Sequence, residues 1–507
     1  MLSLETIHSK LSKRFEVEKI SSLGSIPHPF ELPNVQEASK LIQEAIQNNK
    51  HILIVGDYDA DGILSTALMI LFFRSLKYPH FSFVIPNRFK DGYGISIPLL
   101  EHFPEAELII TVDNGITALE VAEYCKREQK TLIITDHHMP KDELPNALII
   151  NPKVSGFVQE DICGCLVAWY FCAGIKAALE VDFNLTPLFE LVGIAIVSDM
   201  MPLLDLNRII LKKAISLFKS PHFAFSSLLL KEYKKIDEEC IGFYIAPLIN
   251  ASGRMAQAEI ALSFVLSQTQ EEAREHFEAL KALNVQRKVI QKQIFENIDN
   301  HLMITSSCVV AYGEDWHEGV LGILSSKLVE LHQKPSFVLT LKNGIYQGSG
   351  RSFGEIDLIA SLSKLQCLEE FGGHKGAVGL KLKASSLQDF AQNFQPIFDT
   401  TKEEEEDFGT LNPALLTQDL LSLLDSFAPY GEGNPKPIFS LPPLPILSQQ
   451  RIGKDKNHTL LTLQTPFGKP IKAIAFFRTD LELDFKLLKF HITQDTFTHS
   501  PMLLIQS

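Results

Sequence analysis

Residues 51–68 read HILIVGDYDADGILSTAL, and this stretch decides the fold class. The apolar run Ile52–Val55 has the length and composition of a buried β-strand. A glycine and three aspartates at alternate positions follow it: Gly56, Asp57, Asp59 and Asp61. The apolar pattern from Ile63 to Leu76 is then typical of a helix. A strand that passes through a short polar turn into a helix predicts a sheet of parallel strands.

The same alternation continues along the chain. Four more short apolar runs are expected to be strands: Phe83–Ile85, Leu108–Val112, Leu132–Ile134 and Leu148–Ile150. Helical patterns such as Thr117–Arg127 lie between several of them. Strands that alternate with helices favour a mainly parallel sheet that helices cover on both faces. The fold class expected for this region is therefore α/β.

Aspartates stand where the apolar runs end. Asp57, Asp113 and Asp136 each follow a predicted strand within two residues, and Asp199 follows the apolar segment Val192–Val197 in the same way. We therefore expect four acidic strand ends. The carboxyl ends of parallel strands gather along one edge of a sheet, where ligands bind. These segments should thus bring many carboxylates, together with the imidazoles of His137 and His138, into one crevice.

Such a cluster of carboxylates predicts divalent cations. Like charges at short range raise one another's pKa, and cations relieve this repulsion. Oxygen-rich ligands with one or two imidazoles suit Mn²⁺ or Mg²⁺. Two such ions about 3.5–4 Å apart activate water and hold a phosphate for in-line attack. A single Asp-Gly or Asn-Gly after a strand is ordinary turn chemistry, but four acidic strand ends in one domain favour a metal site.

The rest of the chain indicates further domains. Thr269 and Glu272 form the pattern of a capping box that opens a long polar helix. A second α/β region follows, and the last region has short β-like runs broken by Pro and Gly, as in a small β-barrel. The expected domains are an N-terminal extension (1–50) packed on the catalytic domain (51–265), a connecting helix (266–302), a second α/β domain (303–400) and the barrel (408–507).

Composition places limits on the class of protein. The net charge of −14 argues against nucleic-acid binding, although metal-binding carboxylates count as negative until the cations bind. Cys163, Cys165 and Cys172 cluster, but no second Cys/His pair lies at zinc-site spacing, so buried thiols are expected. No apolar run approaches the roughly 18 residues that span a bilayer. We expect a monomer in the cytoplasm, without a membrane partner.

The motifs at the predicted strand ends resemble those of the DHH phosphoesterase superfamily, in the order of that superfamily. They are VGDYDADG (55–62), DNG (113–115), DHH (136–138) and Asp199. The second α/β region resembles a DHH-associated domain through WHEGVLGI (316–323), GSGRS (348–352) and FGGHKGA (371–377). Within the superfamily, NASGR (250–254) and YGEGNP (430–435) resemble the RecJ family, and the latter precedes its OB-fold domain.

The resemblance implies a role for each matching residue. The implied metal ligands are Asp59, Asp61, Asp113, His137 and Asp199, with Asp113 bridging two ions. The implied catalytic set is Asp57, Asp113, Asp136, His137 and His138. The residues implied to hold the substrate, chiefly its 5′ phosphate, are Arg88, Arg254, Ser349, Arg351 and His374.

The resemblance also implies an activity: removal of 5′ mononucleotides from single-stranded DNA in the 5′→3′ direction with Mn²⁺ or Mg²⁺. It suggests work in DNA recombination and repair beside a helicase and a single-strand-binding protein. The OB-like region should bind the DNA through basic side chains near Phe467, Phe476 and Phe477. Those basic residues are Arg451, Lys454, Lys456, Lys469, Lys472, Arg478, Lys486 and Lys489.

Other functions stay open at this point. Short DHH phosphodiesterases degrade oligoribonucleotides or cyclic dinucleotides, but they lack the long helix and the barrel. A superfamily pyrophosphatase would need neither residues 348–352 nor a barrel. A catalytically inactive replication scaffold would have lost ligands, and every expected Asp and His is present. Two departures from the RecJ pattern, at residues 164–167 and at Leu248, affect no expected ligand.

Overall fold

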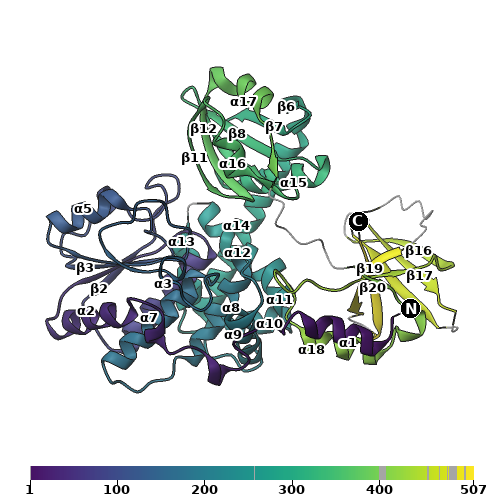
Figure 1. The fold of residues 1–507 in the computed structure, drawn as a ribbon, viewed down its shortest axis with the longest axis horizontal. Coiled ribbons are helices and arrows are strands. Elements are labelled where there is room, and N and C mark those ends of the chain that lie inside the picture. Colours follow the sequence, from purple (N-terminus) through teal and green to yellow (C-terminus); the bar gives the residue numbers. More distant parts are fainter. Residues whose placement is uncertain are drawn as a thin grey trace. The chain divides into compact units, whose positions relative to one another are not determined.

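The computed structural model describes residues 2–16, 18–255, 257–398, 407–453, 456–466, 469–476, 478, 488–495 and 498–506. They form two compact units (Figure 1). The large unit holds residues 29–199 and 217–403, and the small unit holds residues 1–28, 200–216 and 404–507. Within the described ranges, no helix combines the length and the apolar character needed to cross a bilayer.

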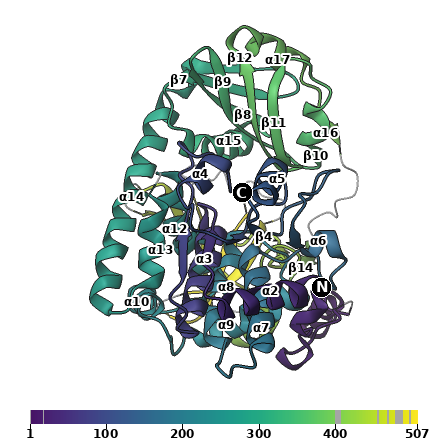
Figure 2. The same ribbon diagram turned by 90° about the vertical axis from the view of Figure 1, so that its left-hand side faces the viewer.

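A five-stranded sheet organises the N-terminal part of the large unit (Figures 1 and 2). Its strands lie in the order β2 (Phe81–Val84), β1 (Ile52–Val55), β3 (Leu108–Val112), β4 (Thr131–Thr135) and β5 (Leu148–Ile150). Every neighbouring pair is parallel. The predicted parallel sheet is confirmed, and each strand begins and ends within two residues of its predicted range.

Helices cover both faces of this sheet, as expected. The helices are α2 (Val35–Gln47), α3 (Ala60–Ser75), α4 (Ile97–Glu101), α5 (Leu119–Arg127), α6 (Pro152–Ser155) and α7 (Gly164–Ala178). Alternate side chains of the strands, such as Leu53 and Ile109, share a core with α4 and α5. Helices α3 and α7 contact the strands and pack against each other, and α2 packs on α7.

One predicted strand is wrong. The apolar segment Val192–Val197 belongs to a helix, α8 (Phe189–Ser198), and Asp199 is the C-cap of that helix rather than the end of a strand. Residues 189–196 are all buried. A helix that is buried on every side has no polar stripe, so its sequence is a continuous apolar run like that of an internal strand.

The predicted long helix is confirmed as α14 (Gln270–Glu296), which lies within the expected range 266–302. The side chain of Thr269 accepts a hydrogen bond from the Glu272 amide, and the Glu272 side chain accepts one in return, so the capping box is present. This helix packs against α10 (Ala224–Tyr233), α12 (Ala246–Arg254) and α13 (Ala258–Leu266). The short helices α11 (Glu238–Cys240) and η4 (Ile241–Ile245) precede α12.

A six-stranded sheet forms the last part of the large unit (Figures 1 and 2). Its order is β11 (Leu368–His374), β12 (Ala377–Lys383), β9 (Ile345–Arg351), β8 (Ser336–Lys342), β7 (Val309–Glu314) and β6 (Leu302–Ile304). Only β7 and β8 pair in parallel. Its helices are α15 (Glu318–His332), α16 (Leu358–Leu362) and α17 (Leu387–Asn393), and α14 packs on α15.

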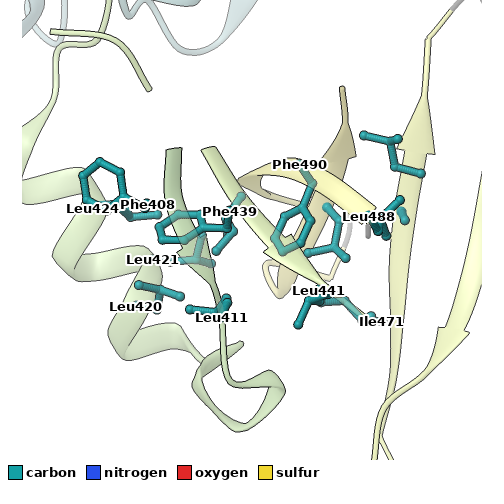
Figure 3. Close-up of a cluster of buried hydrophobic side chains, with 14 of the residues drawn as sticks. Phe408, Leu411, Leu420, Leu421, Leu424, Phe439, Leu441, Ile471, Leu488 and Phe490 are labelled. Carbon is teal, nitrogen blue, oxygen red and sulfur yellow. The ribbon is translucent and has the colours of Figure 1, made fainter. Parts of the chain in front are cut away.

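The small unit is built on a seven-stranded sheet, as predicted for an OB-like region. Its order is β14 (Asp407–Thr410), β15 (Ile438–Leu441), β19 (Leu488–Gln494), β20 (Pro501–Ile505), β18 (Pro470–Ala475), β17 (His458–Gln464) and β16 (Ile446–Ile452). Its core lies between the strands and α18 (Gln418–Phe427). Figure 3 shows Leu420 and Leu421 of α18 facing Phe439 of β15.

The N-terminal segment departs from the expected arrangement, in which residues 1–50 pack together on the catalytic domain. Only residues 29–50 group with the large unit. Helix α1 (Leu4–Lys13) instead places Ile7 and Leu11 in the core of the small unit. Helix α9 (Asp205–Leu217) also begins in the small unit. An amphipathic helix shows that it has a partner, but its sequence does not say which one.

Candidate two-metal active site

Three of the four predicted carboxylate positions follow strands of the parallel sheet. Asp57, Asp113 and Asp136 lie just past β1, β3 and β4, and all three are buried. Glycines allow them to approach closely. A Cβ atom on Gly62 would lie 2.6 Å from Asp57 Cβ, and one on Gly164 would lie 2.6 Å from Asp113 Oδ1. Neither glycine could be replaced without moving a candidate ligand.

The start of α3 positions the next two aspartates. Asp59 is the N-cap of α3, and its carboxylate accepts a 3.0 Å hydrogen bond from the Gly62 amide. Asp61 lies in the first turn and accepts hydrogen bonds from the amides of Gly164 (2.6 Å) and Cys165 (2.8 Å). Those amides open α7, so the N-terminal dipole of a second helix also faces the Asp61 carboxylate.

Asp113 has an unusual backbone. Its φ angle is 62°, in the left-handed region that few residues other than glycine adopt. Its carboxylate Oδ1 lies 3.1 Å from His137 Nε2, and that nitrogen also lies 3.4 Å from Asp199 Oδ2 and 3.7 Å from Asp61 Oδ2. One imidazole thus stands among three carboxylates that come from β3, α3 and α8.

Asp136 orients His138. Its carboxylate accepts hydrogen bonds from His138 Nδ1 (2.8 Å) and from the amides of His137 (2.7 Å) and Ile116 (2.9 Å). Burial raises the pKa of Asp136, but its hydrogen bond to His138 and the charge there outweigh burial and lower it overall. Burial lowers the pKa of His138, but the bond to Asp136 outweighs it and raises the pKa to about 9. His138 is therefore a cation at neutral pH.

Burial and neighbouring charges shift the pKa of the remaining groups. Burial, and then the neighbouring carboxylates, hold the pKa of Asp57, Asp113 and Asp199 well above the usual value. Burial and Asp59 raise the pKa of Asp61 to about 7. Burial and the nearby His138 lower the pKa of His137 to about 3, so this imidazole is neutral, the form that binds metals.

Three of these carboxylate atoms have no hydrogen-bond partner. Among the described residues, no hydrogen bond reaches Asp57 Oδ1, Asp113 Oδ1 or Asp199 Oδ2, although all three are buried. Buried polar atoms normally find a hydrogen-bond partner, so these three oxygens indicate a site that binds a ligand. The donors are carboxylate oxygens with one or two imidazoles, which suits Mn²⁺ or Mg²⁺. The residues present therefore fit divalent cations.

Three groups of side chains bring their ligand atoms within 4.8 Å of one another. The groups are Asp57 with Asp59 and Asp113, Asp61 with His137 and Asp199, and Asp113 with His137 and His138. All five sequence-predicted metal ligands belong to these groups. Asp57 and His138, which the resemblance places in the catalytic set, also lie within ligand range.

Three predicted substrate arginines gather in the large unit. Burial, and then the charges of Arg88 and Arg351, lower the pKa of Arg254 to about 10. Burial and Arg88 also lower the pKa of Arg351. Within the described ranges, no carboxylate lies at salt-bridge distance from any of the three. Arg254 and Arg351 donate only to the Gly319 and Gly350 carbonyls. Guanidinium groups that repel one another and lack a carboxylate partner indicate an anion site.

The other predicted substrate residues lie on neighbouring strands. A Cβ atom on Gly322 would lie 2.9 Å from an Arg351 guanidinium nitrogen and 3.6 Å from Ser349 Oγ, so both side chains face the start of α15. His374 ends β11, and its Nδ1 accepts a 3.2 Å hydrogen bond from the Gly376 amide. Burial and the charge of Arg351 lower the pKa of His374, which places it near the arginines.

Some residues of the site were not predicted. The Tyr93 hydroxyl lies 3.5 Å from both ring nitrogens of His138, and the Arg88 guanidinium lies 5.1 Å from the centre of the Tyr58 ring. Asn114 donates to the Val55 and Val112 carbonyls and ties the ends of β1 and β3 together. Tyr58 and Asn114 lie inside the recognised motifs, but nothing in the sequence around Tyr93 marks it.

Comparison with known proteins agrees with this geometry. The sequence matches the DHH family, N-terminal domain, over residues 51–196, the DHHA1 domain over 305–399 and the RecJ OB domain over 409–495. A single-stranded-DNA-specific exonuclease RecJ from Haemophilus influenzae is 32% identical over 493 residues, which cover 90% of this chain and 86% of the relative. The chain belongs to the RecJ family.

Two solved structures of the RecJ family support the fold. RecJ from Thermus thermophilus in complex with Mn²⁺ has a TM-score of 0.83 at 24% identity, and the match covers 99% of this chain and 75% of that one. An exonuclease RecJ bound to manganese has a TM-score of 0.64 at 26% identity, with 73% of this chain and 95% of that one covered. The expected fold class, with a DHH domain, a DHH-associated domain and an OB-like domain, is confirmed.

Proposed function

We propose that this chain is a metal-dependent exonuclease that hydrolyses single-stranded DNA from its 5′ end to 5′ mononucleotides. The observation that carries the proposal is the set of buried carboxylate oxygens without a hydrogen-bond partner that gather with His137 at the edge of the parallel sheet. The RecJ relative from Haemophilus influenzae, described as a single-stranded-DNA-specific exonuclease, supports the same substrate and reaction.

The candidate ligands divide between two cations that share Asp113. Asp57 and Asp59 would hold one ion with Asp113, and Asp61, His137 and Asp199 would hold the other with Asp113, whose Oδ1 lies 3.1 Å from His137 Nε2. Two such cations supply an activated water and neutralise the charge that develops on the attacked phosphate. The chain's own part is to fix these ligands: the amides that open α7 hold Asp61, and the Gly62 amide holds Asp59.

His138 is proposed to contact the scissile phosphate. Its Nδ1 proton is held by Asp136, which leaves the Nε2 proton free to donate to a phosphate oxygen. The Tyr93 hydroxyl, at 3.5 Å, limits the directions in which the ring can turn. A protonated imidazole stabilises negative charge that develops on oxygen during hydrolysis.

The pH dependence of the rate tests this role. With a His138 pKa of about 9, kcat/KM of the wild type should fall as the pH rises through about 9, because the cation is lost. Asp136→Asn removes the group that raises this pKa, so the fall should move to lower pH. The measurement is kcat/KM of both proteins against pH with Mg²⁺. If kcat/KM falls at the same high pH in both, the proposed role of Asp136 and His138 is excluded.

The arginine group is proposed to bind the terminal 5′ phosphate. Arg88, Arg254 and Arg351 offer planar donors that match a phosphate, and Ser349 adds a hydroxyl. A terminal phosphate carries more charge and more free oxygens than an internal one. Recognition of that end explains why hydrolysis would begin at the 5′ terminus and release one nucleotide at a time.

The small unit is proposed to bind single-stranded DNA. Phe476 is 49% exposed, so its ring is available to stack on a base. Lys456 and Lys469 are exposed, whereas Lys472 and Lys489 pair with Asp495 (2.7 Å) and Asp407 (3.0 Å). Arg451 is exposed and Arg478 is half-buried, and the remaining predicted contacts Lys454, Phe467, Phe477 and Lys486 lie outside the described residues.

Replacing Phe476 and Lys469 together with alanine should weaken binding to long single strands and reduce its salt dependence. One lost phosphate contact lowers the slope of log affinity against log salt by about 0.7. Lys281→Ala is the matched control, because this lysine lies on α14 of the large unit and pairs with Glu278 (2.7 Å). Fluorescence anisotropy at several salt concentrations measures both. An unchanged affinity and slope in the double variant would exclude this surface.

Substrate choice tests the proposed function against its alternatives. We expect Mn²⁺-dependent hydrolysis of single-stranded DNA, with far slower hydrolysis of short oligoribonucleotides and of cyclic dinucleotides. A preference for either of those substrates would favour a DHH phosphodiesterase, and no hydrolysis of any of them would favour an inactive replication scaffold.

We also propose, from the family resemblance, that the protein acts in the cytoplasm as a monomer, in recombination and repair beside a helicase and a single-strand-binding protein.

A further inference from the structure

Helix α14 carries a positively charged residue on its buried face. The side chains that this helix buries are those of Ala273, Phe277, Leu280, Leu283 and Arg287. Their spacing of three or four residues places all five on one face of the helix. The helix packs with α12 and α13, which lie beside it in Figure 2. Four positions of the face hold apolar side chains, whereas the last holds an arginine that is only 8% exposed.

No acid neutralises the buried charge of Arg287. Within the part of the chain that the structure describes, no carboxylate lies at salt-bridge distance from its guanidinium group. Two lysines of the same helix do have acidic partners: Lys281 pairs with Glu278 (2.7 Å) and Lys292 pairs with Glu296 (3.6 Å). Arginine is rarely buried without a partner, because burial of an unpaired charge is costly. The charge of Arg287 therefore indicates an anion that the chain itself does not supply.

Neutral amide groups hold Arg287 in place. Its Nε and Nη2 both donate to Asn284 Oδ1 at 3.1 Å, and its Nη1 donates to Gln291 Oε1 at 3.0 Å. These hydrogen bonds orient the guanidinium plane and use three of its N–H donors. Because an amide oxygen carries no net charge, the positive charge is fixed in position without being neutralised. A carboxylate at either position would have cancelled it.

The arginine group of the proposed phosphate site lies near this cation. Arg254 is the last residue of α12, and its Nη1 donates to the Gly319 carbonyl (3.3 Å) in the first turn of α15. Helix α14 packs on both α12 and α15. Burial and the charges of the other arginines, Arg287 among them, lower the pKa of Arg254. Four guanidinium groups thus share one region of the large unit, and within the described ranges none of them pairs with a carboxylate.

We propose that Arg287 is a positioning residue for the terminal 5′ phosphate, which it attracts through its fixed charge while Arg254 makes the contact. A terminal phosphate carries more negative charge than an internal one, so this charge favours a phosphorylated 5′ end over a 5′ hydroxyl. Binding of the phosphate also relieves the repulsion among the four guanidinium groups. The inference rests on the proposed binding of the 5′ phosphate by Arg88, Arg254 and Arg351.

The affinity of the full chain for short single strands that carry a 5′ phosphate or a 5′ hydroxyl tests the inference. Fluorescence anisotropy of 3′-labelled strands in buffer without divalent cations measures binding without hydrolysis. The quantity compared is the ratio of the two dissociation constants. Arg287→Gln should reduce the preference for the phosphate about tenfold, because unit charges just beyond contact interact by this order at an effective dielectric constant of roughly 20. Arg287→Lys keeps the charge and should keep most of the preference.

Asn284→Asp separates the charge of Arg287 from its packing. The new carboxylate would pair with the guanidinium group that Asn284 already contacts. The preference for the phosphate should therefore fall as in Arg287→Gln, while the melting temperature does not fall. A purely structural arginine would behave differently: Arg287→Gln would lower the melting temperature, and neither variant would change the preference. Lys288→Gln is the matched control, since it removes the same charge from the exposed side of α14 and should keep the wild-type preference.

The outcomes separate this inference from the proposed function. A wild type that binds both strands equally would refute the phosphate site and the inference with it. If the wild type prefers the 5′ phosphate, an unchanged preference in folded Arg287→Gln or folded Asn284→Asp would overturn the inference alone, as would an equal loss in Lys288→Gln. Thermal denaturation establishes which variants are folded. Should Arg287→Gln fail to fold, Asn284→Asp decides the question, because it leaves Arg287 in place.

Discussion

Asp113→Ala is expected to reduce hydrolysis of single-stranded DNA by several orders of magnitude while the protein stays folded. Asp113 is the one carboxylate shared by two of the three candidate ligand groups. Its loss would remove a ligand from both cations, so activation of water and neutralisation of the phosphate would fail together. Stability should not fall, because the buried carboxylate is repelled by Asp61 and Asp59 when no metal is bound.

The rate with saturating Mn²⁺ and the melting temperature without metal measure these two effects. Asp182→Ala is the matched control, because its carboxylate is fully exposed in the segment that follows α7, and the change should affect neither quantity. An Asp113→Ala protein that hydrolyses DNA at nearly the wild-type rate would contradict the two-metal assignment. A large loss of stability in metal-free buffer would contradict the charge argument.

Arg351→Ala is expected to abolish the preference for a 5′-phosphorylated end while Mn²⁺ binding persists. The Arg351 side chain faces the start of α15 beside the Ser349 side chain. Its positive charge repels the guanidinium groups of Arg88 and Arg254. Each charge-assisted hydrogen bond to a phosphate contributes about 1.5–3 kcal/mol. Loss of one such contact should therefore reduce the preference for the phosphate roughly 10- to 100-fold.

The measurement compares rates on single strands that carry a 5′ phosphate or a 5′ hydroxyl. Arg127→Ala is the matched control, since this exposed arginine of α5 pairs with Glu128 at the surface. It should keep the full preference. A wild type without preference, or an Arg351→Ala variant that retains all of it, would place recognition of the end elsewhere in the molecule.

Much of the site could be predicted because it lies where predictable elements end. The strands β1, β3 and β4 are short apolar runs, and parallel pairing puts their carboxyl ends at one edge. Asp57, Asp113 and Asp136 follow those ends directly, so their convergence follows from the sheet alone. The capping box of α14 could also be predicted, because the side chains of Thr269 and Glu272 form hydrogen bonds with the backbone of the same turn.

Other features depend on tertiary packing that the sequence does not encode locally. Helix α8 is buried on every side, so its sequence lacks the hydrophobic periodicity of a helix and predicts a strand instead. Helix α1 is amphipathic, but only the folded chain shows that Ile7 and Leu11 complete the core of the small unit. Tyr93 reaches His138 from a loop, and loop geometry cannot be read from residue types.

The release of label from the two ends of one single-stranded DNA tests the central claim most directly. With Mn²⁺ and a 5′ label, the account predicts that the first labelled product is a mononucleotide. With a 3′ label on the same strand, it predicts a ladder of shortening strands, with labelled mononucleotide only at the end. A mononucleotide as the first product from the 3′-labelled strand, or internal cuts with either label, would contradict the account.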